Sequence, residues 1–227
     1  MRRSLRALRL SLELLVGRRF VLFATIDILA VGIGLLTMLL ESEARPAEIY
    51  SYVFLFPALI LALPAMAGMV DLERQAGCLD LALSAPSAEA YFVRRAAAVC
   101  LLAALQGELI MLGCWLYLGF SFPLLSTLLQ IALTSVFLGA VTLFWAVRLR
   151  TAGAVWLASV ATVGLMWKWF FFNPMSQKLG TVPDPFVPTQ AGDLLSWLAS
   201  LAVLAGGSAL FFLYARRRLR RPELMLS

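Results

Sequence analysis

The amino-acid sequence predicts an all-α polytopic membrane protein, and three observations lead to this prediction. Of the 227 residues, 62% are hydrophobic and only 14% are charged, with a mean hydropathy of +0.88. A soluble domain is about 45–50% apolar and about 25% charged. The apolar residues form runs long enough to cross a bilayer core of about 30 Å as helices. Most basic residues lie outside those runs, in the terminal segments and the loops, as in multi-pass membrane proteins.

Six segments have the length and composition of transmembrane helices, so we predict six spans in a single domain covering residues 1–227. The spans cover approximately residues 20–40, 49–70, 96–120, 122–147, 151–172 and 194–215. Only a short turn near residues 121–123 separates the third span from the fourth. We therefore expect these two helices to form an antiparallel hairpin.

Basic residues set the predicted orientation. If both termini are cytoplasmic, sixteen of the nineteen basic residues fall in cytoplasmic segments. Arg45, Lys168 and Lys178 are the exceptions. Positive charge accumulates in the cytoplasmic loops of membrane proteins. We therefore expect both termini inside, in a bacterial cytoplasmic (inner) membrane.

Residues 1–18 predict an amphipathic helix that lies in the cytoplasmic interface. Leu5, Leu8, Leu12 and Leu15 recur at helical spacing, and arginines together with Glu13 recur on another face. Such a helix buries its apolar face at the headgroup boundary and directs its arginines towards the headgroups. The alternative is a frayed basic tail that only sets the topology.

The segment after the second span carries the most specific pattern in the chain. Leu72, Ala76, Leu79 and Leu83 form one apolar stripe at helical spacing. The proline at position 86 disfavours helical backbone at the residue before it and should end the helix. We therefore predict a short amphipathic helix over residues 72–84, held at the cytoplasmic surface between the second and third spans.

This segment resembles the sequence that follows the second span in permease subunits of type 2 ABC exporters. The matching residues are Glu73, Arg74, Gly77, Leu79, Asp80 and Pro86. An interfacial N-terminal helix, six spans and a Pro-rich external segment before the last span are also similar to that family. The chain differs at Cys78, where the family usually has Thr or Ser, and at Ala82-Leu83, where it often has Leu-Leu.

The resemblance implies a permease subunit that forms a homo- or heterodimer and works with two cytoplasmic ABC ATPase subunits. In that family the helix at residues 72–84 is the coupling helix, which docks on the ATPase. The residues implied to contact the ATPase or position the helix are Glu73, Arg74, Gly77, Leu79 and Asp80. Length and a Leu-rich N-terminal helix give a weaker resemblance to the haem-exporter permease subunit of cytochrome c maturation.

We expect the chain itself to be neither an enzyme nor a cofactor-binding protein. It contains no Gly-x-x-x-x-Gly-Lys-Ser/Thr loop for the phosphates of a nucleotide. ATP and Mg would therefore be bound by the partner ATPase subunit. The small external portion favours a hydrophobic or amphipathic substrate.

Three polar residues inside the predicted spans are candidates for a translocation path. Asp27 lies in the first span, and Gln106 and Glu108 lie in the third. Ionisable residues are costly inside a bilayer, so their presence points to function by default. The alternative is a polar contact between helices.

Aromatic residues cluster at the predicted outer end of the fifth span, where Trp167, Trp169 and Phe170 flank Lys168. An aromatic belt with a lysine that reaches the interface explains this pattern. The alternative is a hydrophobic external gate.

Two other functions fit the same spans: a membrane assembly or scaffold protein that transports nothing, and a membrane-embedded enzyme. The enzyme is the weaker alternative because the chain has no His and few carboxylates within its spans. The three cysteines have no CxxC spacing and predict neither a disulfide nor a zinc site. Topology accounts for the net charge of +6, so we expect no nucleic-acid partner.

Overall fold

A computed structural model describes residues 56–79, 88–117, 124–172 and 194–221, and positions 25, 28, 29, 31–33, 35, 36 and 40. At the ends of some helices only the backbone is described. The long helices are α4 (Phe56–Gln75), α6 (Ala88–Tyr117), α7 (Leu124–Ala146), α8 (Ala152–Phe172) and α10 (Leu194–Leu219). No residue in these ranges lies in a strand, which confirms the predicted all-α class.

Three of these helices contain segments long and apolar enough to cross a membrane, which indicates a membrane protein. The segments are Glu89–Gly113 in α6, Leu125–Ala146 in α7 and Trp197–Leu219 in α10. A shorter apolar stretch, Ala152–Met166, lies in α8. The described residues thus show fewer spans than the six predicted. Part of the difference arises because most of the first span and the start of the second lie outside the described residues. The predicted interfacial helix lies outside them as well.

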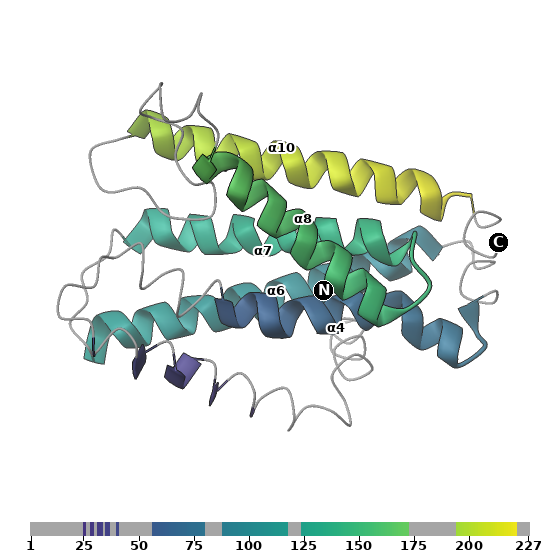
Figure 1. Cartoon of the computed structure of the whole chain (residues 1–227), viewed down its shortest axis with the longest axis horizontal. Helices are drawn as coiled ribbons and strands as arrows, with labels where there is room; N and C mark the ends of the chain where they lie inside the picture. The colour runs from purple at the N-terminus through teal and green to yellow at the C-terminus, as the bar shows by residue number, and fades with distance from the viewer. Residues whose placement is uncertain are drawn as a thin grey trace, which may run out of the picture.

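Helix α7 lies at the centre of the described helices and contacts α4, α6, α8 and α10 (Figure 1). In the most apolar 18-residue stretch of each helix, 67% of the residues are buried in α7, against 33% in α6 and 22% in α10. Two of the buried hydroxyls of α7 are satisfied within the helix: Ser135 donates to the carbonyl oxygen of Ile131 and Thr142 to that of Leu138. This bonding lets a polar side chain lie inside an apolar bundle without an orphan donor.

Two glycines allow close approach between α7 and its neighbours. A Cβ atom at Gly139 of α7 would overlap the Cys100 sulfur of α6. A Cβ atom at Gly207 of α10 would lie 2.8 Å from a ring carbon of Phe137 in α7. Small residues at helix contacts are typical of membrane bundles, where van der Waals packing drives helix association.

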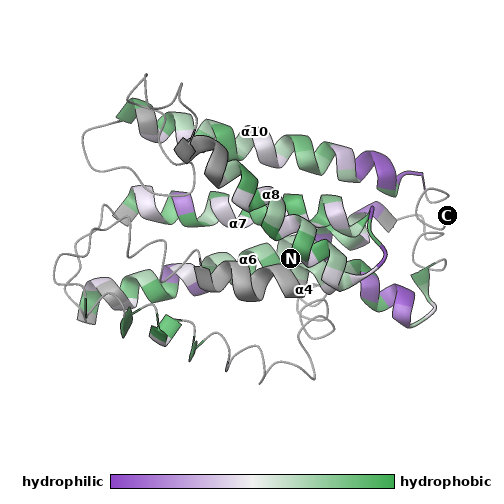
Figure 2. Cartoon of the chain, viewed as in Figure 1, coloured by the Kyte–Doolittle hydropathy of each residue, from purple (hydrophilic) through white to green (hydrophobic). Residues whose placement is uncertain are grey.

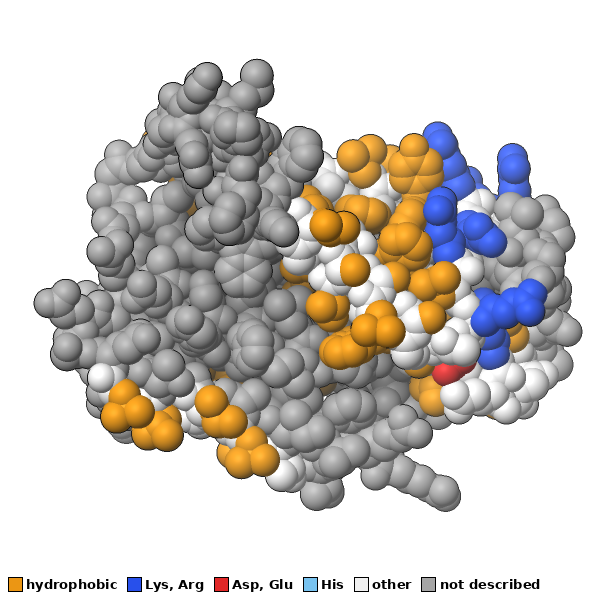
Figure 3. Space-filling model, in the orientation of Figure 1, with side chains coloured by type: hydrophobic (Ala, Val, Ile, Leu, Met, Phe, Trp, Pro, Cys, Tyr) orange, Lys and Arg blue, Asp and Glu red, His pale blue; other side chains and the backbone are white. Residues whose placement is uncertain are grey.

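One end of the bundle is strongly basic, and we call it the basic end. The C-terminal ends of α4 and α10 and the turn between α7 and α8 meet there, and Figure 2 shows hydrophilic residues concentrated on them. The start of α6 lies at this end too, because its Arg95 pairs with Glu73 of α4 and its Glu89 pairs with Arg216 of α10. The described arginines all belong to these four segments: Arg74, Arg94, Arg95, Arg148, Arg150, Arg216, Arg217, Arg218, Arg220 and Arg221. Figure 3 shows Lys and Arg side chains gathered there on one face of the molecule. Arginines that are far apart in the sequence therefore lie together at the basic end.

The helix predicted over residues 72–84 does not begin at Leu72. Instead, α4 continues without interruption to Gln75, a turn follows at residues 76 and 77, and Leu79 is again helical. The break occurs at Gly77, whose φ of 66° lies in the left-handed region that ends helices. Residues 72–75 therefore form the last turn of α4, and residues 80–87 lie outside the described residues.

Two helices are longer than their predicted spans. The third span was expected from residue 96, but α6 already begins at Ala88. The last span was expected to end at residue 215, but α10 continues to Leu219 and includes three arginines in its last turn. Hydropathy marks only the apolar part of a helix, whereas the backbone continues into the polar interface, where arginines extend their charged ends towards water.

Candidate functional site

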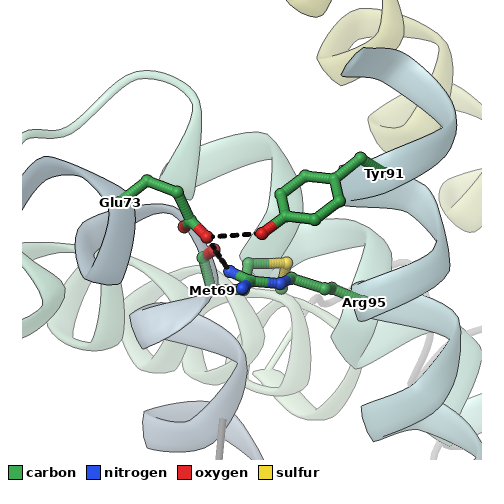
Figure 4. A network of polar contacts seen from close by, with 4 residues as sticks. All are labelled: Met69, Glu73, Tyr91 and Arg95. Atoms are coloured by element: carbon green, nitrogen blue, oxygen red, sulfur yellow. Dashed lines mark hydrogen bonds and ion pairs between the residues drawn. The ribbon is translucent and has the colours of Figure 1, made fainter. Parts of the chain in front are cut away.

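A buried polar network joins the last turns of α4 to the start of α6 (Figure 4). Oε1 of Glu73 accepts a hydrogen bond from the Tyr91 hydroxyl at 2.7 Å and lies 2.5 Å from Nη1 of Arg95. The same Arg95 nitrogen donates to the backbone carbonyl oxygen of Met69 at 2.9 Å. The side chains of Arg95 and Glu73 are only 3% and 9% exposed. The network is therefore a buried ion pair in which each charged group also makes a hydrogen bond to an uncharged partner.

Helical spacing explains how four residues meet at this point. Met69 and Glu73 lie one turn apart on α4, and Tyr91 and Arg95 lie one turn apart on α6, so each helix presents one pair to the other. The Arg95 guanidinium also lies 4.6 Å from the centroid of the Tyr91 ring, within reach of a cation–π interaction. The contact between α4 and α6 is thus fixed by charge and shape together.

This network is only partly satisfied. Oε2 of Glu73 and Nε of Arg95 are buried without a hydrogen-bond partner in the described part of the chain. Partly satisfied buried groups are costly because the low dielectric raises the penalty of each missing bond. The Glu73–Arg95 pair therefore has unused capacity for one more donor and one more acceptor.

Arg74, the next residue, contacts a different element. Its Nη1 donates to the backbone carbonyl oxygen of Leu149 at 2.5 Å, in the turn between α7 and α8. Burial lowers the pKa of the Arg74 guanidinium, and nearby Asp71 partly offsets this effect. Thr151 caps the start of α8 by accepting a hydrogen bond from the Ala154 amide at 3.3 Å. Glu73 and Arg74 together therefore connect the end of α4 to α6 and to the α7–α8 turn.

Gly77 ends α4 with a Schellman motif. The Cys78 amide donates to the carbonyl oxygen of Glu73 at 2.9 Å, and the Gly77 amide donates to that of Arg74 at 3.1 Å. Leu79 then turns inward and is buried with Phe92 in the hydrophobic cluster at this end of the bundle. Gly77 and Leu79 thus fix the direction in which the chain leaves α4.

Four of the five residues implied to contact an ATPase or to position the helix lie at the end of α4 and in the turn after it, where Glu73 and Leu79 are buried: Glu73, Arg74, Gly77 and Leu79. The fifth, Asp80, lies outside the described residues, as does Asp27 of the first predicted span. The network partners of Glu73 are Tyr91 and Arg95, which the sequence analysis did not select. The signal available in the sequence was a Tyr and an Arg one helical turn apart at the start of an apolar helix.

The other candidate residues lie away from this network. Gln106 and Glu108 are half-buried in α6, and Glu108 is thirteen residues beyond Arg95, about 20 Å along the helix at about 1.5 Å per residue. Trp167, Trp169 and Phe170 belong to α8 by their backbone, and their side chains lie outside the described residues. Gln106 and Glu108 are therefore separated from the basic end.

A second ion-pair cluster links α6 to α10 at the basic end. The Glu89 carboxylate of α6 pairs with Arg216, and its Oε2 lies 2.9 Å from Nε of Arg220. In the described residues no group of three or more His, Cys, Asp and Glu side chains could hold a metal ion. The arrangement at the basic end is a set of electrostatic connections between helix ends.

Comparison with known proteins identified no matching family model, curated protein or solved structure.

Proposed function

We propose that this chain is the transmembrane permease subunit of an ATP-driven exporter of the type 2 ABC class. It would move a hydrophobic or amphipathic substrate across a bacterial cytoplasmic membrane. The observation that carries the proposal is the connection of the last turn of α4 to α6 through Glu73 and to the α7–α8 turn through Arg74. These residues belong to the sequence pattern that resembles the coupling segment of that family.

The contacts suggest how a force at the basic end would reach the spans. A partner pressing on the segment after Gly77 would act on a chain whose direction is fixed by the Schellman motif and by buried Leu79. Displacement of the end of α4 would then move α6 through the Glu73–Arg95 pair and α8 through the contact of Arg74 with Leu149. Because separating the buried Glu73–Arg95 pair is costly, α4 and α6 would move together, and the hydrogen bond of Arg74 would carry part of the displacement to the α7–α8 turn.

The proposed assembly has two permease subunits, identical or different, and two cytoplasmic ATPase subunits that bind ATP and Mg. In this arrangement each chain crosses the membrane six times with both termini inside. The basic end would then face the cytoplasm and the ATPase, in agreement with the positive-inside rule.

Co-purification tests the assignment. The tagged chain is expressed with its neighbouring genes and extracted in mild detergent, and ATP hydrolysis is measured. We expect a stoichiometric partner that carries a Walker A loop. A chain that purifies without hydrolysis under several gentle conditions, or only with proteins that lack a nucleotide-binding loop, would instead support a membrane assembly protein.

Two variants test the coupling route within that complex. Arg74→Gln weakens the connection to Leu149, and Glu73→Gln weakens the connection to Arg95. We expect both to retain the ATPase partner but to lose the link between hydrolysis and transport. Gln75→Ala is the matched control, because Gln75 is exposed in the same turn and its side chain donates a hydrogen bond to Asp71 in its own helix. Full coupling in both variants would contradict the proposed route.

A further inference from the structure

An apolar groove lies between α6, α7 and α10. Its volume is about 540 Å³, within the roughly 300–1,000 Å³ of small-molecule sites. Helices α6 and α10 both pack along α7 but touch each other only slightly, which leaves the groove between them. Small residues make up more than half of its lining, among them Ala97, Ala104, Gly139 and Ala209. The groove therefore results from small side chains and from the weak contact between α6 and α10, in the apolar part of the bundle.

The groove has the length of one leaflet. Its lining covers residues 93–104 on α6 and 132–143 on α7, which is eleven residue steps, or about 17 Å at about 1.5 Å per residue. Half of a bilayer core of about 30 Å is about 15 Å. A transmembrane helix would need twice this length, whereas an acyl chain that starts at the interface fits it.

Positive side chains stand where the groove meets the basic end. Exposed Arg94 lies three and seven residues before Ala97 and Leu101, so it shares their face of α6. On α10, Arg216 follows the lining residue Phe212 by one turn. Glu89 pairs with Arg216 and Arg220 and so joins α6 to α10 at this end. The three arginines outnumber the single carboxylate, and the mouth is basic.

We propose that this groove binds an anionic phospholipid of the leaflet at the basic end. One acyl chain lies in the groove, and the phosphate contacts Arg94, Arg216 and Arg220. Apolar lining, leaflet length and a basic mouth are the three features that such a lipid requires. A second copy of the chain in the same membrane orientation would bring its own arginines to this end, and the like charges would oppose docking there. The inference does not depend on the proposed function.

The proposal is tested with the full chain. The protein is reconstituted with equal amounts of phosphatidylglycerol and phosphatidylcholine and extracted gently, and bound lipid is counted by native mass spectrometry. We expect one retained phosphatidylglycerol per chain. The Arg94→Gln/Arg216→Gln variant should lower the preference for the anionic lipid roughly thirtyfold, given the usual contribution of each of two basic residues near anionic lipid. Arg148→Gln/Arg217→Gln is the matched control, since these exposed arginines are at the same end but do not follow the groove lining.

A second variant blocks the groove and keeps its charges. Ala97→Phe should abolish retention of the lipid, whereas Ala161→Phe, at an exposed position of α8 away from the groove, should not. The single variant Arg94→Gln leaves the Glu89–Arg216 pair intact. It therefore tests the basic mouth even if the double variant fails to fold. The proposal would be overturned if the wild type retained the two lipids equally. It would also be overturned if the Arg94 variants kept the same preference for phosphatidylglycerol as the Arg148→Gln/Arg217→Gln control. A groove variant that keeps its lipid but dissociates a dimer would assign the groove to a second copy.

Discussion

Glu73 connects two helices through one carboxylate oxygen, which accepts from both Tyr91 and Arg95. Glu73→Ala should lower the free energy of unfolding by about 3–5 kcal/mol, because it leaves the buried Arg95 charge without its counterion. Tyr91→Phe removes only one hydrogen bond to a charged group and should cost about 1.5–3 kcal/mol. Thermal or denaturant unfolding in detergent measures both values.

The double variant Glu73→Ala/Arg95→Met shows how much of the loss in the single variant comes from leaving the Arg95 charge unpaired. Removing both charges should recover much of the loss seen in the single variant, since an apolar replacement of a buried pair is often tolerated. If Glu73→Ala alone unfolds like the wild type, the ion pair does not hold α4 against α6.

Gly77 is the residue whose backbone conformation other residues adopt with difficulty. Its φ is 66° and, apart from its chain neighbours, no atom of the described residues lies within 4 Å of an added Cβ, so we expect the effect of Gly77→Ala to come from the backbone. We expect a loss of about 1–2 kcal/mol in the free energy of unfolding. Gly77→Asn should cost less, because Asn enters the left-handed region more readily. Gly164→Ala, within α8 and also with open space, is the control and should be neutral or stabilising. Equal stability of the Ala variant and the wild type would contradict the Schellman assignment.

The sequence pattern contains Glu73, Arg74, Gly77 and Leu79, but it does not identify the residues that Glu73 and Arg74 contact. Tyr91 and Leu149 lie 18 and 75 residues away from the side chains that they contact. Such contacts depend on the register between helices, which periodicity within one helix does not fix. The break at Gly77 could have been predicted, since a basic residue in the last turn followed by Gly is a helix-stop pattern. The apolar stripe concealed it, because Leu72 and Leu79 keep helical spacing across the turn.

At the scale of the helices, α7 is the central helix, and its packing depends on small residues. Gly139→Ala should force α6 and α7 apart, because the added methyl group would overlap the Cys100 sulfur. Overpacking of this kind costs about 1–3 kcal/mol. Cys100→Ala removes the obstructing sulfur, so the double variant should recover most of the stability, as measured by thermal unfolding. No loss in Gly139→Ala, or no recovery in the double variant, would contradict the close contact between these helices.

Hydropathy predicted where most helices occur but not how they are arranged. The segments of α6, α7 and α10 are about equally apolar, with mean hydropathies of 1.8, 1.9 and 1.9, yet α7 is far more buried than the other two. Its hydroxyl groups mark the difference, since Thr134, Ser135 and Thr142 are all fully buried. A polar group on a lipid-facing surface would be unfavourable, so a row of hydroxyls in an apolar helix favours a position inside the bundle.

At the scale of the whole molecule, the arginines of separate segments form one basic end, as the positive-inside pattern predicts. Which side of the membrane this end faces is a prediction that Cys78 can test. Cys78 is a free, exposed cysteine at the basic end. With Cys100 and Cys114 replaced by Ala, it becomes the single thiol of the chain.

We expect a membrane-impermeant maleimide to label Cys78 in inside-out vesicles and not in intact cells. A cysteine placed at Lys178, in the predicted external segment, should show the reverse pattern in a chain whose Cys78 is also replaced. The outcome bears on every proposal that uses the basic end. Labelling of Cys78 from outside would place Glu73, Arg74 and Gly77 on the face where no ATP is present, and the coupling role would fail. The Glu73–Arg95 pair would then only stabilise the bundle, and the groove would take its lipid from the outer leaflet.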